Sequence, residues 1–196
     1  MVTKIILATI FAYLLGSVSN AIIICKLYRL PDPRACGSNN PGTTNVLRIG
    51  GKLPAILTLF GDVLKGFFVV MLANQINILP IGIAMVMVAV FLGHLYPVFF
   101  RFQGGKGVAT AIGILLAFSW QLGLLLIVIW TCVVSITKIS SLGAIIVSLV
   151  AIYCGWWMFD FPYSWVITII ACLLLFRHKQ NIIRLLHGEE LKIKRV

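Results

Sequence analysis

Long apolar runs separated by short polar connections dominate the pattern of this chain. A helix needs about 20 apolar residues to cross the hydrocarbon core of a bilayer, which is about 30 Å thick. Most of the runs reach or approach that length, so we expect membrane-spanning helices rather than the helices of a soluble core. The runs cover roughly residues 3–25, 53–73, 79–100, 108–136, 141–159 and 162–176.

The fourth run is too long for a single crossing. At about 1.5 Å per residue it would extend about 44 Å as one helix. Ser119, Trp120 and Gln121 lie near its middle, where polar residues and an interfacial aromatic side chain allow the chain to turn. We therefore divide the run into 108–118 and 121–136 and expect seven spans in all.

Lysine and arginine are distributed unevenly between the two ends of these spans. With the N-terminus outside, 14 of the 16 Lys and Arg residues lie on one side, and the opposite side keeps only Lys4 and Asp160. Cytoplasmic loops of membrane proteins are enriched in Lys and Arg, so we expect the basic side to be cytoplasmic. The 14 residues are Lys26, Arg29, Arg34, Arg48, Lys52, Arg101, Lys106, Lys138, Arg177, Lys179, Arg184, Lys192, Lys194 and Arg195.

Composition favours a single integral membrane domain over residues 1–196, because 61% of the residues are hydrophobic and only 11% are charged. The formal net charge of +11 is also typical of nucleic-acid-binding proteins. Here, however, the basic residues lie between apolar segments rather than on one soluble face, so we expect no nucleic-acid partner. The fold class expected is an all-α helix bundle. A five-span alternative has 108–136 crossing once and 160–176 lying in the membrane interface.

A glycine-rich polar segment over residues 93–110, here the second polar segment, carries the strongest chemical signal. Gly104, Gly105 and Gly107 allow successive backbone N–H groups to converge on an anion, and Lys106 adds positive charge. This arrangement predicts a phosphate site at the membrane face. The alternative is that Lys106 is a topology signal and the glycines only turn the chain. The pattern G-x-x-x-x-G-K-[ST] is absent, so nucleotide hydrolysis is not expected.

Two further polar segments fall on the same expected face. The first polar segment, residues 36–48, offers the hydroxyl of Ser38 and the guanidinium of Arg48, which suits phosphate; the alternative is a capped turn before a helix. The third polar segment, residues 177–190, reads as a helix leaving the membrane, with His178 and Asn181 on one face. Its alternative is a basic helix resting on anionic lipid headgroups.

Together the three polar segments resemble the bacterial acyl-phosphate:glycerol-3-phosphate acyltransferase family. The family pattern G-S-G-N-P-G-A-T-N-V-L-R is met from Gly37 to Arg48, except at Asn39 and Thr43. The pattern G-H-x-x-P-x-F-x-x-F-x-G-G-K-G-V-A-T is met throughout the second polar segment, and H-x-x-N-I-x-R-L-x-x-G-x-E is met in the third. Three long motifs in the same order, over nearly the whole chain, make a specific match.

The resemblance implies transfer of a fatty acyl group from acyl phosphate to sn-glycerol 3-phosphate. The products are lysophosphatidic acid and phosphate, in the first acylation step of phospholipid synthesis. It also implies a multi-pass protein of the bacterial inner membrane with its active site on the cytoplasmic side, in contact with membrane lipid. An upstream enzyme that forms acyl phosphate is an implied partner, and neither a cofactor nor a metal is expected.

Residue roles follow from the same resemblance. Ser38 and Arg48 are implied to be catalytic, and the loop from Gly104 to Gly107, which contains Gly105 and Lys106, to bind glycerol 3-phosphate. His178 and Asn181 are implied to be essential for activity, and Glu190 to be structural. We add His94 as a further catalytic candidate, although a histidine bonded to a neighbouring helix is the alternative. Asn45 is a further candidate for substrate binding.

Acyl phosphate is a mixed anhydride with a good leaving group, so direct attack by the substrate hydroxyl needs no acyl-enzyme. Ser38 is therefore expected to orient substrate or to donate to the oxyanion. The general base stays open between His178, His94 and the phosphate of the substrate. Asp62 and Lys65, three residues apart in the second span, are expected to form a buried structural ion pair.

A transporter for a phosphorylated solute is the rival from another class. It predicts an internal repeat and a binding site near the membrane midplane. No repeat is evident in the sequence, and the polar segments lie at one face. A third possibility, a membrane scaffold without activity, leaves the concentration of polar side chains on that face unexplained.

Overall fold

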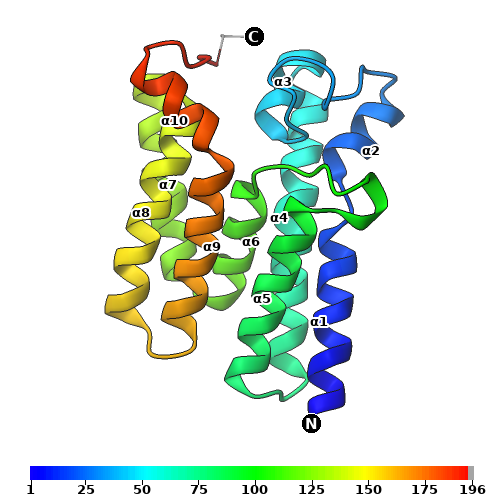
Figure 1. The fold of residues 1–196 in the computed structure, drawn as a ribbon, viewed down its shortest axis with the longest axis vertical. Helices are drawn as coiled ribbons and strands as arrows, with labels where there is room; N and C mark the ends of the chain where they lie inside the picture. Colours follow the sequence, from blue (N-terminus) through cyan, green and yellow to red (C-terminus); the bar gives the residue numbers. More distant parts are fainter. Residues whose placement is uncertain (194–196) are drawn as a thin grey trace.

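The computed structural model describes residues 1–193, and within them the chain forms ten α-helices and one short 3-10 helix without strands. Helices prevail because apolar surroundings leave every backbone polar group to be satisfied within the chain. Most of them run side by side along one axis (Figure 1), which confirms the expected all-α bundle. The elements are α1 (Val2–Gly16), α2 (Asn20–Leu27), α3 (Thr43–Gly50), α4 (Lys52–Gln75), α5 (Pro80–Leu95), η1 (Val98–Phe100), α6 (Val108–Phe118), α7 (Trp120–Thr137), α8 (Ser140–Met158), α9 (Tyr163–Arg177) and α10 (Lys179–Leu186).

Five segments among the described residues are long and apolar enough to cross a membrane, or six if α9 and α10, bent by 57° at their junction, count as one. The apolar helix α6 is shorter, so seven spans stays a prediction. The break expected in the fourth apolar run is confirmed, because α6 ends at Phe118 and α7 begins at Trp120. Ser119 caps α7 by accepting the N–H of Leu122. Residues 108–136 therefore form two helices rather than one.

The first apolar run differs from the single helix expected over 3–25, because α1 ends at Gly16 and α2 begins at Asn20. The break has a polar cause inside the bundle. The carbonyl of Val18, freed from helical bonding, accepts a 2.8 Å hydrogen bond from the ammonium of Lys65 on α4. A charged lysine within an apolar helix needs such an acceptor, and the interrupted helix supplies it.

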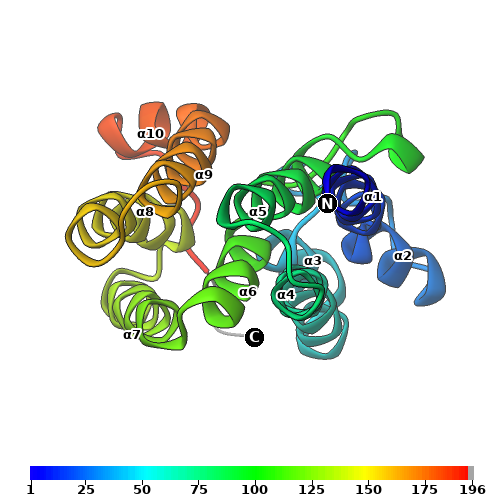
Figure 2. The ribbon, with the colours of Figure 1, turned by 90° about the horizontal axis from the view of Figure 1, so that it is seen from below.

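The bundle has two groups of helices, with α6 between them. Figure 2 shows α1, α4 and α5 on one side, α7, α8 and α9 on the other, and α6 at the centre. Glycines allow α6 to approach α4 at backbone distance: a Cβ on Gly113 would lie 2.1 Å from the carbonyl oxygen of Val63, and one on Gly66 would lie 2.5 Å from that of Thr110. This contact fixes the N-terminus of α6, and Lys106 before it, against the first group.

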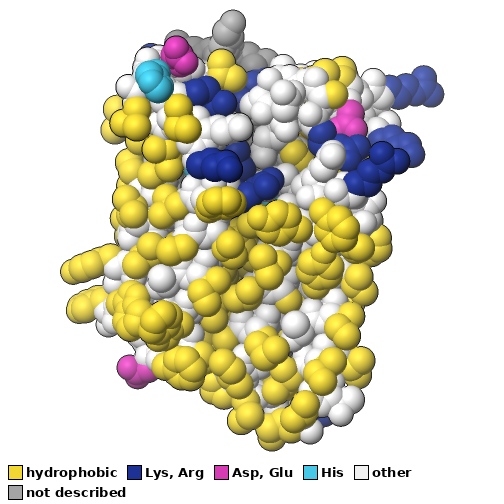
Figure 3. Space-filling model, in the orientation of Figure 1, with side chains coloured by type: hydrophobic (Ala, Val, Ile, Leu, Met, Phe, Trp, Pro, Cys, Tyr) yellow, Lys and Arg dark blue, Asp and Glu magenta, His cyan; other side chains and the backbone are white. Residues whose placement is uncertain are grey.

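Apolar side chains cover most of the visible surface, and lysines and arginines gather near the end that carries α2, α3 and α10 (Figure 3). The N-terminus and the turn between α8 and α9 lie at the opposite end (Figure 1). This distribution agrees with the charge pattern of the sequence. Lys194 and Arg195, which belong to that pattern, lie outside the described residues.

Candidate active site

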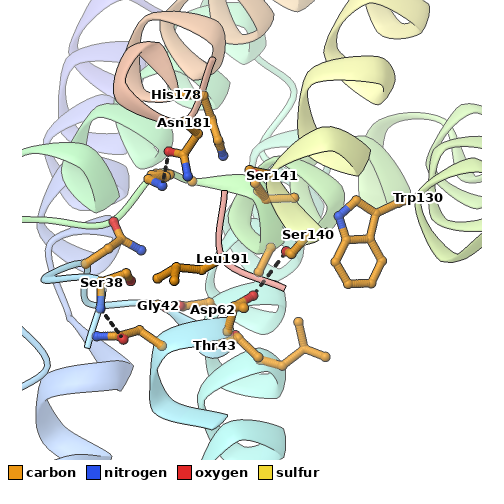
Figure 4. Close-up of a pocket in the computed structure, with 18 of the residues that line it drawn as sticks. Ser38, Gly42, Thr43, Asp62, Trp130, Ser140, Ser141, His178, Asn181 and Leu191 are labelled. Atoms are coloured by element: carbon orange, nitrogen blue, oxygen red, sulfur yellow. Dashed lines mark hydrogen bonds between the residues drawn. The ribbon is translucent and has the colours of Figure 1, made fainter. Parts of the chain in front are cut away.

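One pocket brings the three polar segments together at the basic end of the bundle (Figure 4). Its walls come from the loop before α3, the loop before α6, the junction of α9 and α10, and the chain after α10. Of the residues predicted from sequence, those lining the pocket are Ser38, Asn45, Arg48, Asp62, His94, Lys106, Gly107, His178, Asn181 and Glu190. Gly104, Gly105 and Lys65 lie outside its lining.

Asn45 organises the first polar segment. Its side chain is 1% exposed, and both protons of its amide nitrogen are used, one for the carbonyl of Pro33 and one for that of Cys36, each at 2.9 Å. Its amide oxygen accepts the N–H of Ser38 at 2.8 Å. Asn45 lines the pocket, where its donors hold the loop and the loop holds Ser38. Binding of substrate by Asn45 stays a prediction.

The glycine loop of the second polar segment is built differently from the expected nest. The N–H of Gly105 donates to the carbonyl of His94 at 3.2 Å, and φ at Gly105 is not positive. The carbonyls of Gly104 and Gly105 accept hydrogen bonds from the guanidinium of Arg177, at 2.9 and 3.2 Å. These two glycines are buried behind the pocket wall, so close packing rather than a left-handed backbone requires them. Among the loop glycines only Gly107, with φ +92°, adopts the left-handed region.

Lys106 is the member of that loop that reaches the other segments. Its ammonium donates to the side-chain oxygen of Asn181, whose amide nitrogen donates to Glu190 at 2.6 Å. Glu190 also accepts from Ser141 on α8 and from Arg184 on α10, both at 2.8 Å. The second and third polar segments thus form one hydrogen-bonded network, and the contacts of Glu190 fit the structural role expected for it.

Positive charge exceeds negative charge around this network. Burial, together with Arg184, Arg48 and Arg177, lowers the pKa of Lys106 to about 8, against the opposing attraction of Glu190. Burial would raise the pKa of Glu190, but its hydrogen bonds from Arg184, Asn181 and Ser141 outweigh that effect and lower it. Glu190 is therefore ionised at neutral pH. Asp62, which also lines the pocket, is paired with Lys65. Arg48, Lys106 and Arg184 therefore outnumber the remaining carboxylate, Glu190, and leave a pocket suited to anions such as phosphate.

His178 lies at the junction of α9 and α10, not within one continuous helix as the sequence suggested. Its ring is 3% exposed, and Nδ1 lies 2.8 Å from the carbonyl oxygen of Leu174. A carbonyl only accepts hydrogen bonds, so Nδ1 carries the proton and Nε2 of the neutral ring is free to accept one. The bend turns α10, which carries Asn181, away from the axis of α9. Figure 1 shows α10 at the end of the bundle.

Asp62 and Lys65 form the predicted buried ion pair, with 3.0 Å between Oδ1 and Nζ and side-chain exposures of 3% and 5%. The sequence did not indicate its other partners. Asn20 donates to Asp62 Oδ1 at 3.0 Å, and Nδ1 of His94 lies 3.7 Å from the same oxygen. His94 also packs against Gly105, because a Cβ added to Gly105 would lie 2.4 Å from Nε2 of the His94 ring. His94 therefore lies between Asp62 of the ion pair and Gly105 of the glycine loop.

The chain after α10 closes the end of the pocket. Leu191 lines it, and its carbonyl accepts a 3.2 Å hydrogen bond from Arg48. Farther on, the N–H of Ile193 donates to the carbonyl of Lys138 at 2.7 Å. Sequence reasoning missed Leu191 and Ser141, because a leucine or a serine outside a motif carries no chemical signal. It also missed the contacts of Arg177, because their partners are backbone carbonyls of the glycine loop. Within residues 1–193 no group of three or more His, Cys, Asp or Glu side chains could hold a metal ion.

Comparisons with known proteins agree on one family. Residues 6–188 match the family model described as glycerol-3-phosphate acyltransferase. The chain is 52% identical over 184 residues to the glycerol-3-phosphate acyltransferase of Proteus mirabilis, covering 94% of this chain and 84% of that protein. It is 50% identical to that of Francisella philomiragia, covering 94% and 90%.

Two solved structures have the same fold. One is PlsY, an integral membrane glycerol 3-phosphate acyltransferase, in its glycerol 3-phosphate form; it is 36% identical with a TM-score of 0.93, covering 97% of this chain and 96% of that chain. The other is the lysophosphatidic acid form of PlsY, 35% identical with a TM-score of 0.86, covering 96% and 95%. Both likenesses extend over nearly the full length of the chain.

Proposed function

The chain belongs to the glycerol-3-phosphate acyltransferase family, and on that premise we propose that it transfers a fatty acyl group from acyl phosphate to sn-glycerol 3-phosphate. The observation that carries this proposal is the cationic pocket, whose lining contains Arg48, Lys106 and Arg184 around Glu190. The products are lysophosphatidic acid and inorganic phosphate. Acyl phosphate is reactive in water, so an upstream enzyme that forms it must supply the donor.

Two phosphate groups must be held for this reaction, one on each substrate. Lys106 stands before the N-terminus of α6, where helical N–H groups add positive potential, and we assign it to the phosphate of glycerol 3-phosphate. Arg48 lies across the pocket on α3, and its planar guanidinium suits the phosphate of the donor. Attraction to both anions offsets the repulsion between them when they meet.

Transfer proceeds by attack of the glycerol hydroxyl on the acyl carbonyl carbon. The new C–O bond forms as the bond from that carbon to the phosphate oxygen breaks, and phosphate leaves with the bonding electron pair. Ser38 lines the pocket, and Asn45 holds its backbone there. Its hydroxyl donates a hydrogen bond to the developing oxyanion. The hydroxyl proton goes to Nε2 of His178, the ring nitrogen left free by the contact with Leu174. His94 serves the loop behind Gly105, so we assign it a positioning role.

A membrane location follows from the family and the apolar surface. We propose that the chain crosses the bacterial inner membrane seven times, with the pocket on the cytoplasmic side. The apolar lining contributed by Leu59, Val108 and Ile112 lies next to the polar groups, which suits a donor that carries a fatty chain. The donor then reaches the pocket from the membrane and glycerol 3-phosphate reaches it from the cytoplasm.

The donor is tested directly with purified protein in detergent. Acyl phosphate and the corresponding acyl thioester are supplied separately with glycerol 3-phosphate, and lysophosphatidic acid is measured. We expect product with acyl phosphate and little with the thioester. Product formed from the thioester alone would overturn the proposed donor while leaving the acceptor and the family assignment in place.

Activity should depend on the charge of Lys106. Its pKa of about 8 means that the charged form predominates below that pH, so kcat/KM for glycerol 3-phosphate should fall as pH rises through 8. In Lys106→Arg the guanidinium stays charged, so the fall should move to above about pH 10. Lys138→Arg, outside the pocket lining, is the matched control. If kcat/KM fell at the same alkaline pH in wild type and in Lys106→Arg, ionisation of Lys106 would be excluded as the cause of the fall.

Orientation is tested by labelling single cysteines in intact cells, on a background without the native cysteines. Positions 106, 138 and 192 should be protected from an impermeant reagent, whereas positions 4 and 160 should react. The reason is the charge asymmetry, in which only Lys4 and Asp160 lie on the sparsely charged side. Reaction at position 138 from outside would contradict the seven-span orientation.

A further inference from the structure

Two residues of the pocket lining each have a buried polar atom without a hydrogen-bond partner. Within residues 1–193, Oγ1 of Thr43 and Nε1 of Trp130 are buried and have no partner, and both residues line the pocket. Buried N–H and O–H groups are normally bonded, because leaving one unmade costs folding free energy. Unmade bonds in residues that line a substrate pocket are explained if the side chains turn to the substrate and it completes them.

The first turn of α8 contacts Trp130 and the residue that follows Thr43. Thr43 opens α3, and the next residue, Thr44, has its hydroxyl 3.1 Å from that of Ser140 at the start of α8. Trp130 of α7 packs against Gly143, where a Cβ would lie 2.8 Å from Cδ1 and 3.1 Å from Nε1 of the indole. Because Gly143 has no side chain, the N–H edge of the indole can pack directly against α8. In Figure 4 the indole nitrogen lies on the ring edge that faces Ser140.

Trp130 lies at a boundary between apolar and polar surroundings. Its ring packs against an apolar cluster that includes Leu126 and Val147. Ser140 and Ser141 belong with it to the pocket lining. The indole nitrogen only donates hydrogen bonds, so its partner must be an acceptor. A ligand that presents oxygen acceptors at the head of an alkyl chain fits both sides of this boundary. Glycerol 3-phosphate has no alkyl chain, so it does not match the apolar side of this boundary.

We propose that Trp130 and Thr43 form a headgroup subsite for the acyl donor, in which Nε1–H and Oγ1–H donate to oxygen atoms of the acyl phosphate group. The proposal rests on the proposed function, because it assumes that an acyl phosphate occupies this pocket. The two donors hold the carbonyl end of the amphiphile at the boundary, and Arg48 balances the charge of its phosphate. They set the affinity for the donor and take no part in proton transfer.

The test removes each donor while keeping the shape of the side chain. Trp130→Phe keeps an aromatic ring without the N–H, and Thr43→Val replaces the hydroxyl by a methyl group. Each should raise the KM for acyl phosphate by roughly 3- to 30-fold, the effect of one or two lost hydrogen bonds. The KM for glycerol 3-phosphate and kcat at saturating donor should change by less than about twofold, as expected for lost binding.

Two controls separate this role from a structural one. Thr43→Ser keeps the hydroxyl, so its KM for acyl phosphate should equal that of wild type, in contrast to Thr43→Val. Trp156→Phe removes an indole N–H that donates to Thr168 at 3.0 Å, outside the pocket lining, and should leave the KM for acyl phosphate unchanged. A measurement without turnover adds a second readout. Lysophosphatidic acid should change the tryptophan fluorescence of wild type and of Trp156→Phe, and that change should be lost in Trp130→Phe.

The outcomes distinguish this proposal from the function on which it rests. Wild-type protein that forms no lysophosphatidic acid from acyl phosphate would reject the proposed donor and this subsite with it. An active wild type with an unchanged KM for acyl phosphate in both Trp130→Phe and Thr43→Val would reject the subsite alone. A rise only in the KM for glycerol 3-phosphate would also reject it, since the two donors would then serve the acceptor.

Discussion

Replacing Ser38 with alanine should lower kcat by about 10²- to 10³-fold, the usual cost of removing one oxyanion donor. The serine lies in a loop held by three hydrogen bonds of Asn45, so its hydroxyl is presented to the pocket in a fixed place. The KM for glycerol 3-phosphate should change little, because Lys106 supplies the charge that binds its phosphate. The measurement is initial rate against each substrate in the folded variant.

Cys36→Ala is the matched control for that experiment, and it should stay largely active. Cys36 belongs to the same loop and is bonded to Asn45 only through its backbone carbonyl, which alanine keeps. A mechanism of direct transfer has no use for the thiol as an acyl carrier. Detection of an acyl group attached to Cys36 or Ser38 during turnover would refute direct transfer.

Gly105→Ala should lower kcat/KM for glycerol 3-phosphate by about 10²-fold, the cost of misplacing catalytic groups by roughly 1 Å. An added Cβ would lie 2.4 Å from Nε2 of His94 and 2.9 Å from the carbonyl oxygen of Pro41. The first and second polar segments meet at this glycine, so the methyl group forces them apart. Both kcat and the KM for glycerol 3-phosphate should therefore change.

Two variants test that explanation. Gly155→Ala adds a methyl group that meets the side chain of Ile167 at 3.0 Å, away from the pocket lining, and should remain active. If the clash with His94 is the cause, the loss in a Gly105→Ala, His94→Ala double variant should be smaller than the product of the two single losses. Independent losses would point instead to a direct role of the Gly105 backbone in binding.

The outcome at Gly105 illustrates how sequence and structure divide the explanation. The glycine-rich pattern correctly indicates that a side chain is excluded there, but several physical causes produce the same pattern. The sequence favoured a backbone that wraps phosphate, whereas the structure has the Gly105 N–H bonded to His94 and the two carbonyls bonded to Arg177. Only the packing distances distinguish a tight contact from a nest.

The sequence by itself determined the apolar helices, the break at Ser119, the buried pair of Asp62 and Lys65, and the polar segments that meet in the pocket. These features depend on run length, local polarity and short spacing, which are properties of neighbouring residues. The motifs added the family, because their order and residues are themselves sequence.

Tertiary structure alone decided which of these residues face the pocket. Which groups the amide of Asn45 binds, and which ring nitrogen of His178 stays free, depends on carbonyl groups that the folded chain places beside them. The break in the first apolar run is likewise set by Lys65, 47 positions from the carbonyl of Val18 that it binds. Hydrogen bonds between residues far apart in the chain leave no periodic trace in the sequence, because their partners are fixed by how the helices pack.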